Sequence, residues 1–237
     1  MQIKAEGPNL VIPFQGGEKS SESGAMIFHG DRGENGEVVI VSDERRNYMV
    51  MDDALMKQMG ARMAETEKMV EEQLKNMTPE QQEAVRKILE SSPGGMGIPS
   101  ASTKSPEVEV KNTGEKATKA GYPCVKYEVI SDGVKIRELW VTDWDNIEGA
   151  DEAAEAFKRM AAFFENMMAA MPNAPGANKL GPFGQAKFDE GFPVVTRGFD
   201  EEGNLTDESI LKSARRQTID PAEFEPPSGY KRMSMGM

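Results

Sequence analysis

The stretch AGYPCVKYEVISDGVKIRELWVTD, residues 120–143, decides the fold class. From 125 to 129, apolar and charged residues alternate, as they do in a strand that buries one face. Ser, Asp and Gly follow at 131–133, which are typical turn residues, and a second apolar run containing Ile136 and Trp140 comes next. Because so short a turn joins only antiparallel neighbours, the stretch predicts a β-hairpin.

Further short strands are predicted toward both ends of the chain. Before residue 53, apolar or alternating runs are separated by turn clusters such as GGEKSSESG and DRGENGE. A final hairpin is predicted at 192–199 and 204–216, and the tail DPAEFEPPSGYKR offers Phe224 and Tyr230 as anchors. The other strands are expected at 9–14, 25–30, 37–43, 47–52 and 107–114.

Helical periodicity interrupts these strands twice, at about 52–91 and 151–171. In the first insertion, apolar residues such as Met56 and Met63 recur at spacings of three and four, which places them on one helical face. TPEQ at 78–81 has the residues of a helix start, so we expect a second helix from there to about residue 91. The helix of the second insertion carries an apolar stripe of Phe157, Met160, Phe164, Met167, Met168 and Met171.

The order of elements is therefore strands, two helices, strands, one helix and strands. Short turns between consecutive strands favour an antiparallel sheet, and helices inserted as groups cover one face of such a sheet. We predict a single α+β domain over residues 1–237. It is expected to be a strongly curved antiparallel sheet, a half-barrel, with about three helices on its concave face.

Composition excludes several classes of partner. The chain has 237 residues, and 28 Lys and Arg against 40 Asp and Glu give a net charge of −12, which disfavours nucleic acid and anionic lipid surfaces. No apolar run approaches the roughly 20 residues of a transmembrane helix. The start, MQIKAEGPNLVIPF, lacks the features of a signal peptide, and we expect none in this chain.

We expect no enzyme activity, no metal site and no cofactor. Cys124 and His29 are the only cysteine and histidine, which excludes ordinary zinc and copper sites, and nothing in the sequence places a base beside the thiol. The acidic run DWDNIEGADE at 143–152 fails the EF-hand pattern because Ile147 and Glu148 stand where a ligand and Gly are required. No P-loop, GxGxxG, GxSxG or HExxH motif occurs.

Four segments, in order, carry a resemblance to a known family. The segments are GYPCVKYEV (121–129), ELWVTDW (138–144), GFPV (191–194) and DPAEFEPPSGYK (220–231). With them the chain resembles the bacterial family called domain of unknown function 4412 over most of its length, weakly before about Gly24. That family in turn resembles the lipoprotein carriers LolA and LolB, in which a curved sheet and helices enclose an apolar cavity. The resemblance implies a mature domain of the periplasm or cell envelope whose export signal has been removed, and it implies no catalytic residues.

The 17 methionines, many on helical stripes, leave two functional hypotheses open. In the first, the helices stand off the sheet, and the protein binds a lipid acyl chain or the lipid of a lipoprotein in a sheet–helix cavity. In the second, the core is filled, and the protein is a structural or sensory module that binds an envelope protein. Under the first hypothesis, we expect Tyr127, Trp140, Phe157, Phe164 and Met63 to line the cavity.

Overall fold

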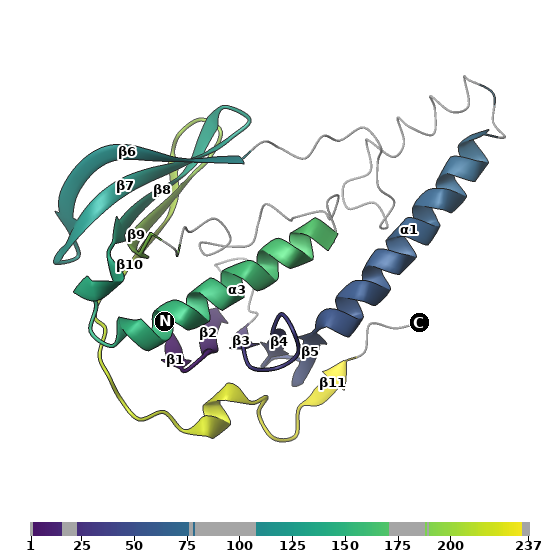
Figure 1. Ribbon diagram of the computed structural model, residues 1–237, viewed down its shortest axis with the longest axis horizontal. Coiled ribbons are helices and arrows are strands. Elements are labelled where there is room, and N and C mark those ends of the chain that lie inside the picture. The colour runs from purple at the N-terminus through teal and green to yellow at the C-terminus, as the bar shows by residue number, and fades with distance from the viewer. Residues whose placement is uncertain are drawn as a thin grey trace.

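The computed structural model describes residues 2–15, 23–75, 78, 108–170, 188 and 190–233. These residues form two β-sheets, here called sheet A and sheet B, and two α-helices (Figure 1). The helices are α1 (Asp53–Lys75) and α3 (Ala150–Ala170), and the 3-10 turns are η1 (Trp144–Asn146) and η4 (Pro221–Phe224). Sheet A contains β1 (Lys4–Glu6), β2 (Asn9–Gln15), β3 (Ser23–His29), β4 (Glu37–Ser42), β5 (Asn47–Met51) and β11 (Lys231–Met233). Sheet B contains β6 (Val108–Lys119), β7 (Tyr122–Ser131), β8 (Val134–Thr142), β9 (Phe192–Phe199) and β10 (Leu205–Ile210).

The α+β class is confirmed, whereas the single half-barrel sheet is not found. Sheet A has the order β1-β2-β3-β4-β5-β11 and sheet B the order β10-β9-β8-β7-β6, and neither is strongly curled. Two features explain the division. The free edge of β5 is occupied by β11, which pairs with it in parallel, so β6 cannot extend sheet A. In addition, about ten strands is the size at which an open sheet usually splits or curls.

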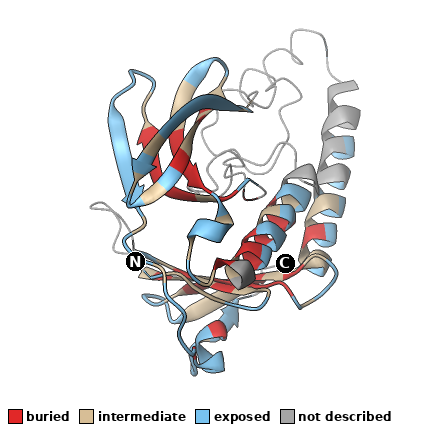
Figure 2. Cartoon of the chain, turned by 60° about the vertical axis from the view of Figure 1, so that its left-hand side comes forward, coloured by how far each residue is buried: buried red, intermediate tan, exposed pale blue. Residues whose placement is uncertain are grey.

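Helix α3 covers one face of sheet A, as the apolar stripe of the second insertion predicts. Phe157 and Met160 are buried against β1 and β2, and the Phe163 ring, fully buried, meets Phe28 of β3 edge to face at 6.0 Å between ring centroids. In Figure 2 the buried residues of α3 face the sheet. This interface is a filled core of interlocking Phe and Met side chains.

Helix α1 begins where the sequence predicts, after Asp52, whose Oδ1 accepts the Leu55 backbone N–H at 2.8 Å. Its first turn buries Met56 in the core beneath α3, and the helix then runs away from both sheets (Figure 1). Two helices therefore belong to the described residues, against about three expected. Apart from Thr78, the helix predicted at 78–91 lies outside the described residues.

The C-terminal tail covers the opposite face of sheet A. Ile219 and Phe224 are buried against β3, β4 and β5, and the Tyr230 hydroxyl donates to Asp43 at 3.0 Å. The tail leaves sheet B after β10 and passes under sheet A to reach β11 (Figure 1). Sheet A is thus covered on both faces, by α3 and by the tail. That the whole of 1–237 is one domain stays a prediction.

Sheet B contains the hairpin that the opening stretch predicts. Asp132 and Gly133 connect β7 to β8 with φ of 49° and 83°, the positive values that a tight two-residue hairpin turn requires. Where β9 begins, four aromatic rings join sheet B to α3 with centroids 5.0–6.4 Å apart. The rings belong to Trp144, Phe157, Phe188 and Phe192, and the Trp144 Nε1–H donates to the Phe188 carbonyl at 2.8 Å.

Candidate functional site

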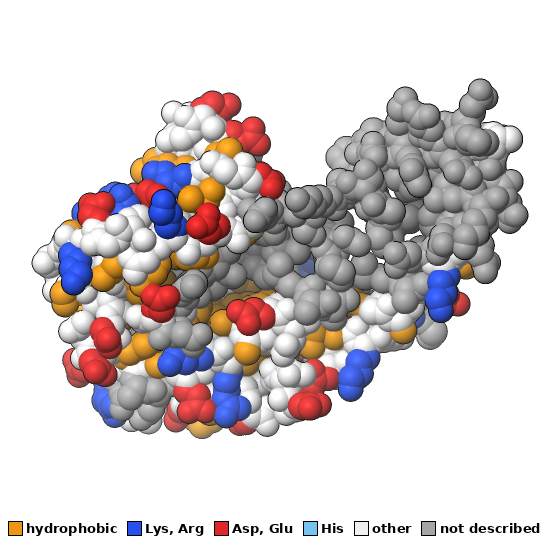
Figure 3. All heavy atoms as spheres, turned by 45° about the horizontal axis from the view of Figure 1, so that its top comes forward, with side chains coloured by type: hydrophobic (Ala, Val, Ile, Leu, Met, Phe, Trp, Pro, Cys, Tyr) orange, Lys and Arg blue, Asp and Glu red, His pale blue; other side chains and the backbone are white. Residues whose placement is uncertain are grey.

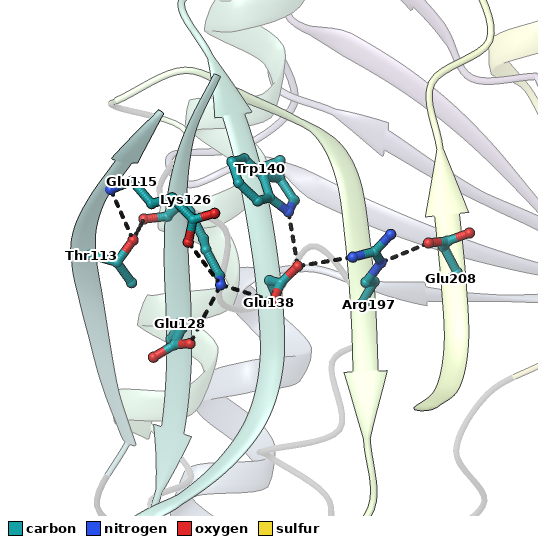
Figure 4. Close-up of polar contacts among 8 residues, drawn as sticks. All are labelled: Thr113, Glu115, Lys126, Glu128, Glu138, Trp140, Arg197 and Glu208. Atoms are coloured by element: carbon teal, nitrogen blue, oxygen red, sulfur yellow. Dashed lines mark hydrogen bonds and ion pairs between the residues drawn. The ribbon is translucent and has the colours of Figure 1, made fainter. Parts of the chain in front are cut away.

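The two faces of sheet B differ in chemistry. Strand pairing places alternate residues of each strand on the same face, and charged side chains gather on one face, which we call the outer face. In Figure 4 the outer face is toward the viewer, and the helical part of the chain lies behind the sheet. The opposite face, toward the helices, we call the inner face. Its rows across β7, β8 and β9 are Val125–Val141–Pro193, Tyr127–Leu139–Thr196 and Val129–Arg137–Gly198.

The inner face is apolar and buried. Tyr127, Val129, Leu139 and Val141 are at most 6% exposed, and they form one cluster with half-buried apolar neighbours. All the apolar members of this cluster come from β6, β7 and β8, so neither described helix contributes to it. The described core on α3 and the inner face of sheet B are therefore separate apolar clusters.

A polar group stands in the middle of this face. The Tyr127 hydroxyl donates to the Glu190 carboxylate and accepts from Asn112 Nδ2 at 3.0 Å. Burial, together with the hydrogen bond to Glu190 and its negative charge, raises the pKa of Tyr127 to about 12. The phenol therefore remains neutral at physiological pH, as a donor already engaged by a carboxylate, and it is not poised as a base.

Arg137 is the charged residue of these inner-face rows, one row from Tyr127. Its Nε and Nη1 atoms are buried and have no hydrogen-bond partner among the described residues. Asp207 belongs to the same row, beyond Gly198, where its Oδ1 would lie 2.1 Å from a Cβ added to that glycine. No ion pair joins Arg137 to Asp207 or to another described carboxylate. Such a guanidinium is costly to bury without a counter-charge.

The outer face carries a chain of ion pairs across all five strands of sheet B, which we call the ladder (Figure 4). It runs Glu115–Lys126–Glu138–Arg197–Glu208 with N–O distances of 3.1, 3.4, 3.2 and 2.7 Å. Most of these side chains are partly exposed, where an ion pair contributes about 0–1 kcal/mol. The exception is Glu138, the central carboxylate, which is 7% exposed as a residue.

Glu138 is held as a carboxylate by its neighbours. Burial raises its pKa, but the hydrogen bond from Trp140 Nε1 at 2.8 Å and the charges of Lys126 and Arg197 outweigh burial and lower the pKa below the ordinary value. Glu128 stands directly opposite Glu138 in the register, a repulsive placement that Lys126 relieves by contacting both. The ladder therefore links the five strands of sheet B by ion pairs in their observed register, with the Glu138 carboxylate between two cations.

Acidic and basic side chains are interspersed over the described surface drawn in Figure 3. No continuous basic area appears among them on that face, in line with the net charge of −12. None of the helices in the described residues is long and apolar enough to cross a membrane.

Comparison with protein-family models gives one match, described as Domain of unknown function (DUF4412), over residues 97–230. This range is more than half of the 237 residues. The chain belongs to the DUF4412 family. The match starts at residue 97, whereas we expected the resemblance to cover most of the chain and to be weak only before about Gly24. No curated protein and no solved structure matches the chain, so the expected likeness to LolA and LolB has no support from solved structures.

The DUF4412 region contains all of sheet B, α3 and η4, whereas β1 to β5 and α1 precede it. Both faces of sheet B, the aromatic junction to α3 and the tail as far as Tyr230 are thus parts of the family domain. The four segments that carry the resemblance lie inside the match, except for Lys231 at its end.

The residues expected to line one cavity fall into three separate clusters. Phe157 and Phe164 lie in the core between α3 and sheet A, and Tyr127 lies on the inner face of sheet B. Trp140 lies on the outer face, with Lys119 Nζ 4.5 Å and Lys126 Nζ 5.8 Å from its ring centroid. Met63 belongs to α1, but its side chain lies outside the described residues. That these residues line a ligand site stays a prediction.

Cys124 is a buried thiol, as expected for a structural cysteine. It is 4% exposed, its Sγ lies 3.3 Å from the Tyr122 carbonyl oxygen, and burial raises its pKa. His29 belongs to sheet A and Cys124 to sheet B, so the two do not form a nucleophile–base pair. In the acidic run, Asp143 accepts the Asp145 backbone N–H at 3.0 Å and caps η1.

Arg137 is the residue that sequence reasoning missed. Its signal was present: counting back in twos along β8 from Val141 and Leu139, which lie on the inner face, leads to Arg137. The β-bulge of β8 lies at residue 136, before Arg137, so the alternation of Arg137, Leu139 and Val141 is not interrupted.

Proposed function

We propose that the protein is a non-enzymatic protein of the cell envelope that binds a hydrophobic ligand, an acyl chain or the lipid of a lipoprotein, on the inner face of sheet B. The observation that carries this proposal is the buried apolar cluster of Tyr127, Val129, Leu139 and Val141, to which neither described helix contributes. Apolar burial drives the binding, at about 25 cal/mol per Å² of surface removed from water.

Two further observations support this placement over the cavity expected from the sequence. The space between α3 and sheet A is filled from both sides by described side chains, with Phe28 of β3 packed on Phe163 of α3, whereas no described helix contributes to the cluster on the inner face of sheet B. The outer face of sheet B carries the ladder, whose ionic groups are poor partners for a hydrocarbon chain. The apolar cluster of the outer face, around Trp140, lies beside the cations Lys119 and Lys126, whereas the inner face carries the cluster of Tyr127, Val129, Leu139 and Val141.

The envelope location is part of the proposal. It rests on the resemblance given above, since members of that family usually begin with an export signal. Fractionation of cells that produce the full-length gene product tests the location directly. Recovery in the cytoplasmic fraction alone contradicts it without touching the binding site.

Binding is tested by native mass spectrometry and by titration with a fluorescent fatty acid, followed by mapping with a photoreactive one. We expect saturable binding and cross-links in peptides from β6, β7 and β8. Val125→Gln, on the inner face, should weaken binding at least fivefold, whereas Val134→Gln, at an exposed position of β8, should not. A ligand-free protein that also fails to bind the probe contradicts the proposal, and cross-links confined to α3 contradict the placement.

A second candidate function is favoured by the filled core of α3 and sheet A. A domain whose helix is docked so fully needs no ligand for stability, which fits a structural or sensory module that binds an envelope protein. Absence of lipid binding together with specific co-purification of one envelope protein would favour this candidate.

A further inference from the structure

The only histidine of the chain is buried on the face of sheet A that the C-terminal tail covers. His29 is 2% exposed, and its Nε2 atom is buried without a hydrogen-bond partner in the described part of the chain. It lies two residues after Ile27 on β3, and alternate residues of a strand share a face. Ile27 packs with Ile219 and Phe224 of the tail, so His29 belongs to the same covered face.

An ion pair beside His29 anchors the tail to sheet A. Arg32, in the turn between β3 and β4, pairs with Glu225 of the tail through Nη2 and with Glu37 Oε1 through Nη1 at 3.1 Å. Glu37 stands directly opposite His29 in the register of β3 and β4. The positive charge of Arg32 therefore acts on the imidazole at a point where the tail is attached.

These surroundings keep the imidazole neutral. Burial lowers the pKa of His29 below its ordinary value of 6.5, and the like charge of Arg32 lowers the pKa further. Carboxylates act in the opposite direction without outweighing these two effects, and they are Glu225 of the tail, Glu37 of β4 and Asp31 of the turn. The other charged groups on this side of sheet A are Lys4 and Glu223, which pair with each other, and the exposed Glu6 of β1, at the far end of the row Glu6–Asn9–His29–Glu37.

We propose that His29 is a pH-sensitive switch whose protonation separates the tail, residues 219–233, from sheet A. A charged imidazole is costly in a covered site beside a guanidinium, and it regains water when the tail moves away. Separation would uncover apolar residues that now pack with the tail, among them Ile27, Val39 and Val41. The switch lies in sheet A, and ligand binding at sheet B is not needed for it.

The direction and the size of the effect follow from one proton. The pKa of His29 is lower with the tail attached than the 6.5 of a hydrated imidazole, so attachment is strongest above about pH 7.5 and weakens as the pH falls through 6.5. The ratio of separated to attached tail rises by at most about tenfold per pH unit, because one proton is taken up on separation. The rise ends below the lowered pKa, where both states are protonated.

The test is hydrogen exchange of the full chain, followed by mass spectrometry at pH 7.5 and pH 5.0 and corrected for the intrinsic exchange rates. We expect the protection of peptides from 219–233 to fall at least about threefold more at pH 5.0 than that of peptides from β7 and β8. Unchanged protection of the tail would overturn the proposal. An equal loss over all peptides would also overturn it, since protonation would then act on the stability of the whole fold.

Variants assign the effect to the imidazole. His29→Gln, which is neutral at both pH values, should give a tail whose protection is the same at pH 5.0 and pH 7.5. The matched control is Asp43→Asn, because Asp43 accepts the Tyr230 hydroxyl at 3.0 Å and so anchors the tail far from the imidazole in sequence. The control should loosen the tail at both pH values and keep the whole pH difference. A pH difference that survives His29→Gln would overturn the role of His29.

A measurement on the unmodified chain covers the case in which His29→Gln does not fold. Since the chain has one histidine, its imidazole gives a single set of magnetic resonance signals in a preparation without a histidine tag. These signals should titrate below pH 6.5, and the protection of the tail should fall over the same pH range. An imidazole that titrates at or above pH 6.5, or a tail that loses protection in a different range, would refute the switch.

Discussion

Replacing Glu138 with Gln should destabilise the protein by about 2 kcal/mol, because it removes the one buried charge on which the ladder converges. Glu138 Oε1 lies 3.2 Å from Arg197 Nη1, and Oε2 lies 3.4 Å from Lys126 Nζ. Hydrogen bonds to charged groups contribute about 1.5–3 kcal/mol each, but the loss is not the full sum. Gln can still accept from Trp140.

The outer carboxylates of the ladder, Glu115 and Glu208, limit the loss of stability further. After the substitution Lys126 keeps Glu115 at 3.1 Å, and Arg197 keeps Glu208 at 2.7 Å, so neither cation is stranded. In a protein of this size, about 2 kcal/mol lowers the melting temperature by about 4–8 °C. The measurement is urea or thermal unfolding at pH 7, followed by circular dichroism.

The dependence on pH separates the charge from the packing. The pKa of Glu138 is lower in the folded protein than in the unfolded chain, so its stabilisation is complete above the unfolded value of about 4.5 and is lost as the pH falls below it. The difference between wild type and Glu138→Gln should therefore shrink toward pH 3. The control is Glu128→Gln. The Glu128 carboxylate is more exposed than that of Glu138 and lies 4.0 Å from Lys126 Nζ, farther than Glu138 does, so the free energy of unfolding should fall by at most about 0.5 kcal/mol. Equal effects of the two variants, or a difference that persists unchanged at pH 3, would refute the reasoning.

Three further predictions test other parts of the molecule. One of the four tyrosines should titrate near pH 12 in absorbance at 295 nm, and Tyr127→Phe should remove that step. The stabilisation of the fold by the neutral Tyr127 hydroxyl is complete below the unfolded pKa of about 10 and is lost as the pH rises toward 12. Gly191→Ala should prevent stable folding, because φ is 142° and a Cβ would lie 2.1 Å from the Thr142 carbonyl oxygen, whereas Gly203→Ala, with φ of 83° and open space, should cost only about 1–2 kcal/mol in urea unfolding. Phe163→Ala should cost about 3–5 kcal/mol in the same assay, since the ring is fully buried, and a cost below 1 kcal/mol would mean that the core is not filled.

The individual helices and hairpins could be predicted from the sequence because each depends on residues that are consecutive in the chain. The hairpin of β7 and β8 follows from alternation and from Asp132-Gly133, and α3 matches the helix expected at 151–171. What the sequence does not contain is the partner of each strand. The parallel pairing of Lys231–Met233 with β5 joins residues more than 180 positions apart, and no periodicity in three residues indicates it. This pairing separates the two sheets.

The candidate site was predicted only in part for the same reason. Alternation shows that Tyr127 and Trp140 belong to apolar strands, but it does not show which face of each strand meets the helices. Trp140 lies across the register from Lys126, which fixes it on the outer face, opposite to Tyr127. Arg137 was not predicted because a charged residue beside Glu138 is usually assigned to solvent, although alternation places it on the same face as Leu139.

The distribution of stabilising contacts connects the fold to the proposed binding. Sheet A holds its shape through two covering layers, so its strands depend on the packing of Phe163 and Phe224. Sheet B has the ladder on its outer face and is joined to α3 by the ring of Trp144 and its aromatic neighbours. A sheet whose register is fixed by ion pairs on one face depends less on what lies against the other face. Under the proposed function, the contacts of Glu138 with Lys126 and Arg197 on the outer face remain in place while the inner face exchanges a ligand.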